Sequence, residues 1–577
     1  MAEGAGGCAL APAVGGSRSA GGGTRSRSGG PGPRLARAAL VTAGLTAAGA
    51  VLGLARDQLL ARNFGAGSET DAFLVAWTVP EFASTLLIED AMALVLVPAF
   101  SRALARRGEG AHPDPVRTLV RVTLPRTALA AATGAALLAL AAPVLVPLLA
   151  PGLPRQELAV DCTRLTATCV LSFALAGYFS AALRAHSRFL APAAIYVAYN
   201  IGIITAIVLL GPGWGVRAAA AGVAAGGLLM ALVQGPSLVR RLRSGREAEA
   251  APSRAEEGSR AETGFVLALV APVVLFAVTR QSQVLVERFL AAPLPAGAIS
   301  HLNYAQKIAQ LPMVLSLMLC TVSFPVVARA IAAGDLAAAR RRAERDLLFA
   351  GVVVLTGAAT VVAAAPQIVE ILFQRGAFSA QDTASTAAVM RVYALGLLGH
   401  ALVSALGRVY FSGSRPLWFP AVAIALGVAA NALLGAVWVG PWGASGIALA
   451  NAAGITLTAV LLLLGVGRHG IPLSARAVAG GLARLAVAAG AATAAGGFAA
   501  SWDGPAPVAT LLTGAVVAAV FLAAAHLLRA PVVPDLLRRA RRLLPTVRPV
   551  QRRPAHDRSH DDPSLDRDVP LGRRGQG

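Results

Sequence analysis

Charged side chains inside long apolar stretches are the residues of this sequence that could do chemistry. Arg56 and Asp57 lie more than a helical turn inside the apolar stretch that ends near Arg62. A charge within a membrane is costly and usually faces a cavity or a partner, because lipid offers it no hydrogen bonds. Arginine can hold a phosphate or diphosphate, and a carboxylate can pair with it or take up a cation. These residue types therefore indicate an anion-binding site with acidic partners.

Further charges of both signs fall in apolar stretches. Glu89 and Asp90 lie too deep in one stretch to reach its ends, so we expect them to pair with an arginine or to carry a proton or a sodium ion. Asp71 opens the same stretch, where it either caps a helix or takes part in gating. The predicted substrate-binding cations are Arg56, Arg62, Arg280 and Lys307, and the predicted gating or ion-coupling acids are Asp57, Asp71, Glu81, Glu89, Asp90 and Glu287. For Glu89 and Asp90 the arginine partners that we expect are Arg56 and Arg280.

Lys307 is the only lysine in the sequence. A general preference for arginine does not explain a single exception placed in an apolar stretch, so we expect Lys307 to line a cavity as a point charge. Arg62 and Glu287 lie near the ends of their stretches. For these two, extension of the charged end to the membrane surface is the alternative to a role in the site.

Apolar stretches of near bilayer-crossing length recur from about Ala38 to about Leu528. The chain has 577 residues, of which 56% are hydrophobic and 14% charged, and a soluble protein of this length would need more polar surface. The stretches do not alternate in polarity as barrel strands do, so they predict helices. We place these at about 36–62, 69–104, 115–150, 158–186, 189–210, 214–238, 264–290, 296–332, 338–374, 384–412, 416–438, 443–466, 475–500 and 506–528.

The sequence also repeats itself at an offset of about 228 residues. Phe-Leu-Ala-Pro-Ala at 189–193 returns as Trp-Phe-Pro-Ala at 418–421, and Gly-Trp-Gly at 213–215 returns as Pro-Trp-Gly at 441–443. The sequence therefore predicts an all-α polytopic membrane protein of about 14 transmembrane helices, with two six-helix pseudo-symmetric lobes and a C-terminal helix pair. Duplicated proteins of this kind are typically transporters whose site lies between the halves.

The domain boundaries follow from this repeat and from the polar segments. We predict a disordered basic head at 1–35, lobes at 36–239 and 264–467, a linker at 240–263, two additional helices at 468–528 and a disordered basic tail at 529–577.

The net charge of +22 would suit a nucleic-acid partner, but the arginines are placed differently. Basic connections contain Arg106 and Arg107, Arg184 and Arg188, residues 240–246, residues 340–345, Arg408 and Arg415, and Arg468 and Arg476. The connections between them, at 65–70, 291–296, 440–441 and 503–507, are poor in cations. This alternation predicts a multi-pass membrane protein with both termini in the cytoplasm, and no nucleic-acid partner.

No motif predicts an enzyme or a bound cofactor. Cys8, Cys162, Cys169 and Cys320 lack metal-ligand spacing, and no metal site is expected. The sequence has no Walker motif, nucleophile elbow or zinc-protease motif. Energy for transport would then come from Na+, H+ or the membrane potential.

The stretch from Val51 to Phe100 is the most specific part of the sequence. It reads Val-Leu-Gly-Leu-Ala-Arg-Asp at 51–57, Ala-Arg-Asn-Phe-Gly-Ala-Gly-Ser-Glu-Thr-Asp-Ala-Phe at 61–73 and Val-Pro-Ala-Phe at 97–100. This pattern resembles the MurJ/MviN family of lipid II flippases, within the MOP superfamily of multidrug, oligosaccharidyl-lipid and polysaccharide exporters. The resemblance implies that a polyprenyl-diphosphate-linked peptidoglycan precursor moves from the inner to the outer leaflet by alternating access through a cationic cavity. It also implies a place in the bacterial plasma membrane and a groove for the lipid tail on the last two helices.

The sequence departs from this family pattern in the predicted cavity. A family segment of the type Pro-Asn-Leu-Leu-Arg-Arg is Pro-Glu-Phe-Ala-Ser-Thr at 80–85, a Ser-Arg pair is Gly-Ala at 49–50, an Asp-Arg pair is Gln-Lys at 306–307, and a glutamate is Gln310. Three alternatives therefore stay open. They are a flippase for another lipid-linked polysaccharide, a MATE-like cation or drug antiporter, and a non-transporting scaffold that recruits cell-wall synthesis proteins.

Overall fold

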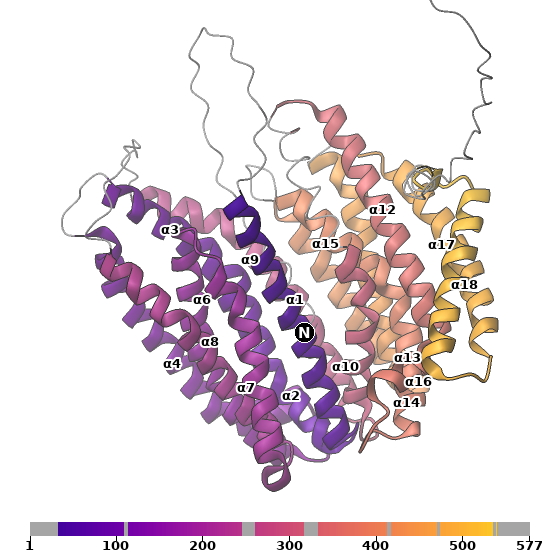
Figure 1. Cartoon of the computed structure of the whole chain (residues 1–577), viewed down its shortest axis with the longest axis horizontal. Helices are drawn as coiled ribbons and strands as arrows, with labels where there is room; N and C mark the ends of the chain where they lie inside the picture. Colours follow the sequence, from indigo (N-terminus) through magenta and orange to yellow (C-terminus); the bar gives the residue numbers. More distant parts are fainter. Residues whose placement is uncertain are drawn as a thin grey trace, which may run out of the picture. The chain divides into compact units, whose positions relative to one another are not determined.

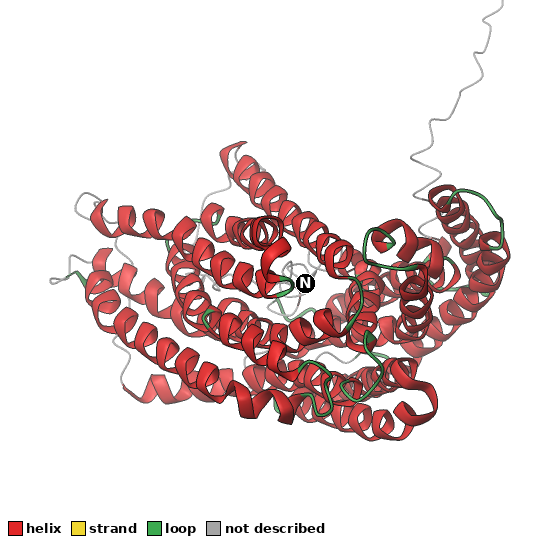
Figure 2. Cartoon of the chain, turned by 90° about the horizontal axis from the view of Figure 1, so that it is seen from below, coloured by secondary structure: helices red, strands yellow, loops and turns green. Residues whose placement is uncertain are grey.

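The computed structural model describes residues 33–108, 114–244, 260–316, 330, 333–411, 417–469, 473–534 and 538. Across these residues the regular secondary structure is helical and contains no strand (Figure 2). The chain divides into two units at Val533, and the description below concerns the first of them. The predicted head up to residue 32, the linker residues 245–259 and the tail beyond 538 lie outside the described residues.

The N-terminal lobe consists of the helices coloured indigo to magenta in Figure 1. They are α1 (Pro33–Phe64), α2 (Ser68–Ala83), η2 (Ser84–Asp90), α3 (Ala91–Gly108), α4 (Pro115–Leu149), α5 (Gln156–Ala167), α6 (Cys169–Ala185), α7 (Leu190–Trp214) and α8 (Arg217–Ser244). The span predicted at 69–104 is in fact three pieces, because Pro80 lies in α2 and the next turn and a half is π-helical. π-helical insertions loosen the backbone ladder and often occur where a helix carries a functional residue.

The C-terminal lobe comprises α9 (Arg260–Ala291), α10 (Ala298–Ala309), α12 (Leu336–Ala363), α13 (Ala365–Phe373), α14 (Ala380–Tyr393), η3 (Ala394–Gly396), α15 (Leu397–Phe411) and α16 (Phe419–His469). Two predicted spans fall within α16, which bends at Gly443 where φ is 54°. The last two helices, α17 (Ala475–Ala500) and α18 (Ala506–Leu527), pack against each other, and α17 also packs on α12 (Figure 1).

Both lobes bring helices together at glycines near the end of the repeat. A Cβ atom on Gly202 of α7 would lie 2.6 Å from the Cα atom of Gly226 of α8. In the other lobe, a Cβ atom on Gly427 would lie 2.7 Å from the carbonyl oxygen of Gly454, across the bend of α16. Small residues allow this close backbone approach, which is a common way for membrane helices to associate. The two repeats therefore share a packing device as well as a sequence pattern.

The described residues contain 11 helices that are long and apolar enough to cross a membrane. One of these, Phe419–Gly467, has 49 residues, which is enough for two crossings. On α4 the outward residues Leu129 and Leu140 are 71% and 77% exposed, as expected of a surface in contact with lipid. The protein is therefore an all-α polytopic membrane protein, while the count of about 14 spans remains a prediction.

Candidate functional site

Three of the predicted charges meet between the lobes. Asp57 of α1 accepts hydrogen bonds at its Oδ1 atom from Arg56, at 3.0 Å from Nε and 2.6 Å from Nη2. Its Oδ2 atom lies 3.1 Å from the Nζ atom of Lys307, which α10 supplies from the other lobe. One buried carboxylate therefore pairs with a cation from each lobe and joins the two lobes.

Arg56 is fixed further by a side chain that sequence reasoning missed. Its Nη1 atom donates to the Oδ1 atom of Asn200 on α7, at 3.0 Å. The Asn200 amide in turn donates to the carbonyl oxygens of Gly49 and Tyr196. An amide side chain in an otherwise apolar stretch needs a buried hydrogen-bond partner, just as a charged side chain there does. The same search, extended from charged residues to amides, would have found Asn200.

Trp77 of α2 completes this group, which we call the interlobe ion site: Arg56, Asp57, Trp77, Asn200 and Lys307. The Arg56 guanidinium carbon lies 4.8 Å from the centre of the indole, and the Lys307 Nζ atom lies 6.0 Å from it. Arg56, Asp57, Trp77 and Lys307 line a cavity of about 10 Å³, near the lower limit for one water molecule. This cavity is too small for a substrate head group.

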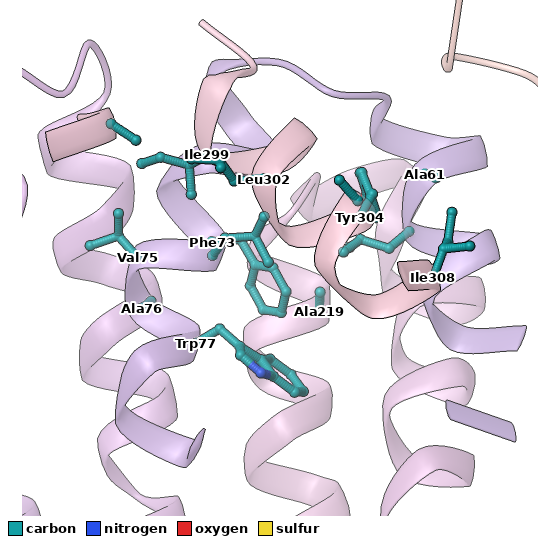
Figure 3. Close-up of a cluster of buried hydrophobic side chains, with 14 of the residues drawn as sticks. Ala61, Phe73, Val75, Ala76, Trp77, Ala219, Ile299, Leu302, Tyr304 and Ile308 are labelled. Atoms are coloured by element: carbon teal, nitrogen blue, oxygen red, sulfur yellow. The ribbon is translucent and has the colours of Figure 1, made fainter. Parts of the chain in front are cut away.

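Apolar side chains surround the interlobe ion site. Figure 3 shows Phe73 and Trp77 along α2, close to Leu302, Tyr304 and Ile308 of α10. All of these are buried, and they belong to one cluster that spans both lobes. Such surroundings strengthen ionic interactions because little water screens them.

Asp71 makes a second contact between the lobes, at the N-terminus of α10. Its carboxylate accepts from the backbone N–H of Gly297 at 2.6 Å, from the N–H of Ser300 at 2.8 Å and from the Ser300 hydroxyl at 2.6 Å. The acid therefore satisfies free N–H groups of a helix in the opposite lobe, where the helix dipole also favours a negative charge. Asp71 does not cap the helix that it opens, because α2 has no side-chain cap; the helix that it caps belongs to the other lobe, and its gating role stays a prediction.

The same end of the molecule is closed by backbone contacts. The carbonyl oxygen of Arg62 accepts from the N–H of Ala377 at 2.8 Å. Gly65 has a φ of 65°, and a Cβ atom there would lie 2.6 Å from the carbonyl oxygen of Ala377. Gly297 has a φ of 97°, so a side chain would be strained at either position. We call these contacts, together with those of Asp71, the latch.

Glu287 and Arg288 of α9 lie in the interior and do not extend to the membrane surface. Each residue is 4% exposed, so the snorkelling alternative is wrong for Glu287. The Glu287 carboxylate accepts from the Nδ2 atom of Asn451 on α16. The Asn451 Oδ1 atom lies 3.2 Å from the Nε2 atom of His400, whose ring stacks on Tyr393. Sequence reasoning predicted Glu287 but missed the residues that it bonds to, directly or through Asn451. We call Glu287, Asn451, His400 and Tyr393 the C-lobe polar core.

The other predicted residues stand outside the interlobe ion site and the C-lobe polar core, and Arg62 joins the latch only through its carbonyl oxygen. Glu89, in the π-helical turn η2, accepts a hydrogen bond of 2.7 Å from the Tyr196 hydroxyl. Glu81 interacts electrostatically with Arg288 and Lys307. Arg280 is half-buried on α9, and Arg62 is exposed at the end of α1. The side chain of Asp90 lies outside the described residues.

The donor types limit which ions the protein can hold. Within the described ranges, no three His, Cys, Asp or Glu side chains gather in a way that could bind a metal ion. The two interior groups combine carboxylates with arginine, lysine and amide groups and, in the C-lobe polar core, the single imidazole of His400. Such sets suit anions, protons or a monovalent cation better than a transition metal.

Comparisons with known proteins agree with this architecture. The family model described as lipid II flippase MurJ matches residues 60–515. The lipid II flippase MurJ of Burkholderia cenocepacia is 29% identical over 449 residues, which cover 76% of this chain and 84% of that protein. The probable lipid II flippase MurJ of Rhizobium tropici is 26% identical over 458 residues, covering 75% of this chain and 80% of that protein.

Solved structures show the same fold. A lipid II flippase MurJ in an inward closed conformation matches with a TM-score of 0.65 at 18% identity, covering 84% of this chain and 98% of that one. An inward-facing multidrug resistance MATE family transporter of the MOP superfamily matches with a TM-score of 0.59 at 16% identity, covering 76% and 99%. At these identities the likeness concerns the fold alone.

Proposed function

Since the chain belongs to the lipid II flippase MurJ family, we propose that it moves a polyprenyl-diphosphate-linked glycan precursor across the membrane. The substrate is lipid II of peptidoglycan synthesis, and the direction is from the inner to the outer leaflet. The cycle is alternating access, in which the two lobes close first at one end of the site and then at the other.

The observation that carries this proposal is the interlobe ion site. Arg56 and Lys307 come from different lobes and share the single carboxylate of Asp57. A diphosphate offers the same kind of acceptor oxygens with more negative charge, so it can take over the bonds that Asp57 accepts here. A head group that enters between separated lobes would then draw the two cations together, and binding would favour closure around it.

The latch supplies the gate of the cycle. Asp71 and the backbone near Gly65 hold the lobes together at one end. The connections rich in arginine are predicted at the opposite end, and by the positive-inside rule this supports a latch on the extracytoplasmic side and both termini in the cytoplasm. The conformation described here is therefore one in which the exit is shut, as expected before the substrate is released.

Glu287 is our candidate for the residue that takes up the coupling ion of the cycle. It is a buried carboxylate within a membrane lobe, and its hydrogen-bonded partners, Asn451 and then His400, belong to other helices of that lobe. Uptake of a proton or a sodium ion would change its charge and so the packing of α9 against α16. No ATP site is part of this proposal.

The proposal is tested by complementation of a bacterium depleted of its own lipid II flippase. We expect this chain to restore growth and the exposure of lipid II on the outer leaflet. Lys307→Ala and Arg56→Ala should abolish both, whereas Arg217→Ala, which changes a half-exposed arginine, should not. A parent chain that inserts well in the membrane but exposes no lipid II would refute the proposal.

Another lipid-linked polysaccharide is the second candidate substrate, and a specific observation favours it. Ser84 and Thr85 stand where an arginine pair is expected from the resemblance, and Glu81 adds a negative charge near Arg288 and Lys307. The cavity therefore carries fewer positive charges than the resemblance implies for a site that binds the anionic head group of lipid II. Parallel complementation of strains lacking a polysaccharide flippase decides between the two substrates.

The basic tail raises a separate question, which is whether the protein also binds partners in cell-wall synthesis. Removing residues 534–577 leaves the first unit of the chain intact. Lipid II exposure should survive this truncation if the chain is a flippase, and a scaffold should lose its effect on growth.

A further inference from the structure

Trp77 touches both cations of the interlobe ion site. Its indole lies 4.8 Å from the Arg56 guanidinium carbon and 6.0 Å from the Lys307 ammonium nitrogen. Arg56 belongs to the same lobe as Trp77, and Lys307 belongs to the other. The contact with Lys307 therefore exists only while the lobes are closed, whereas the contact with Arg56 lies within one lobe.

Two cations on one ring need stabilisation from more than one side. Arg56 and Lys307 repel each other. The carboxylate of Asp57 pairs with both and offsets part of this repulsion. The negative face of an indole attracts a cation without accepting its proton or occupying its hydrogen bonds. Trp77 therefore leaves the donor groups of Arg56 and Lys307 available to an anion.

The ring is held in place by its neighbours. Phe73 packs on it at 5.5 Å and Tyr199 at 6.3 Å between ring centres. Asn200 fixes the guanidinium of Arg56 through a separate hydrogen bond. Trp77 is 3% exposed, so its indole has little freedom to reorient when the cations change partners.

We propose that Trp77 is a positioning residue, whose indole holds Arg56 and Lys307 in register for the diphosphate of the lipid-linked substrate. This inference rests on the proposed function. During binding, the oxyanions of the diphosphate replace the Asp57 carboxylate, and the indole keeps both cations in place during the exchange. Trp77 thereby favours the closed, substrate-bound arrangement over the separated lobes.

Binding of geranylgeranyl diphosphate to the purified full chain tests this inference, with geranylgeranyl monophosphate as the comparison ligand. Phenylalanine at position 77 keeps an aromatic face and leucine removes it, while both leave a hole that is larger for leucine. We expect diphosphate binding about 3-fold weaker in Trp77→Phe and about 10-fold weaker in Trp77→Leu, by loss of cation–π attraction. The monophosphate, which needs fewer donors, should lose less affinity.

A double-mutant cycle separates positioning from packing. Combined with Lys307→Met, Trp77→Leu should weaken diphosphate binding by a smaller factor than it does alone, because one of its two cations is gone. Trp438→Phe and Trp438→Leu, at a tryptophan whose ring packs at a tilt against Trp442 instead, serve as matched controls and should bind like the parent. Thermal unfolding without ligand identifies any variant whose fold is lost, and Trp77→Phe then carries the test.

The outcomes are distinct. Equal losses in the phenylalanine and leucine variants, or fully additive effects with Lys307→Met, would reduce Trp77 to a packing residue and overturn the inference. If the Trp77 effects appear but the parent exposes no lipid II in cells, the inference stands and lipid II flipping fails. If lipid II is exposed equally by the parent and by Trp77→Leu, with equal diphosphate binding, the function stands and the inference fails.

Discussion

The first helices of the two repeats, α1 and α9, have the same length but use their buried charges differently. Each has 32 residues and carries an adjacent acid and arginine in its second half. In α1 the order is Arg56-Asp57, and the acid reaches the opposite lobe through Lys307. In α9 the order is Glu287-Arg288, and the acid bonds to Asn451 within its own lobe.

This difference shows how a duplicated fold can divide two tasks. The charges of α1 lie at the interface, where they can respond to a substrate and to the separation of the lobes. The acid of α9 lies inside a lobe, where it can respond to a small ion without facing the substrate. In the proposed function, two repeats of one fold with different buried charges would bind the substrate in one place and couple energy in another.

Asp57→Asn tests the α1 side of this comparison and should have the largest effect of the substitutions described here. It removes the charge that two buried cations share, and breaking a buried ion pair in this way costs about 3–5 kcal/mol. We expect a clear fall in the thermal unfolding temperature of the purified protein and no lipid II exposure in cells. Glu69→Gln, at an exposed acid of α2 that pairs with Arg155, should have neither effect. Normal transport by Asp57→Asn would show that the interlobe ion pair is dispensable.

Asp71→Asn should open the latch, with the second largest effect. Asparagine keeps one acceptor oxygen and puts an NH2 group in place of the other, so the bonds to one of Gly297 and Ser300 are weakened and those to the other are lost. A buried donor left without its partner costs about 1–3 kcal/mol. The population should shift towards a conformation open at this end. Spin labels at Ala66 and Ala377, which flank the contact, should move apart in the variant. Unchanged distances in a folded variant would refute a gating role for Asp71.

Glu287→Gln tests the α9 side of the comparison. Glutamine has the same shape and can still accept from Asn451, so the variant should fold with little loss of stability. It can no longer change its charge, so transport should become insensitive to the proton or sodium gradient while diphosphate binding persists. The assay is transport in proteoliposomes with each gradient imposed separately. A variant that responds to the gradients like the parent would place the coupling ion elsewhere.

Arg217→Ala should have the smallest effect. Arg217 pairs with Asp161 at 2.7 Å, but both side chains are more than 40% exposed. Exposed ion pairs contribute about 0–1 kcal/mol, so both stability and transport should stay close to those of the parent. Comparing this variant with Asp57→Asn in one experiment measures how much burial adds to an ion pair in this protein. A large loss in Arg217→Ala would show that the exposed pair does more than its surroundings suggest.

The sequence alone determined the fold class and the identity of several important charges. A membrane makes apolar length and the placement of arginine informative, because every span must be apolar and each interior charge is costly. That is why the positions of Arg56, Asp57 and Lys307 within apolar stretches were enough to predict them as site residues. The all-helical, duplicated architecture followed from the same argument.

Only the tertiary structure decided which of these charges meet. The latch joins Asp71 to backbone N–H groups of α10, 226 and 229 positions further along the chain, and backbone donors leave no mark in the side-chain pattern. The burial of Glu287 could not be seen from its position near a helix end, because neighbouring helices cover it. Trp77 carries no charge, so its role as a shared surface for two cations appears only when α1, α2 and α10 are packed together.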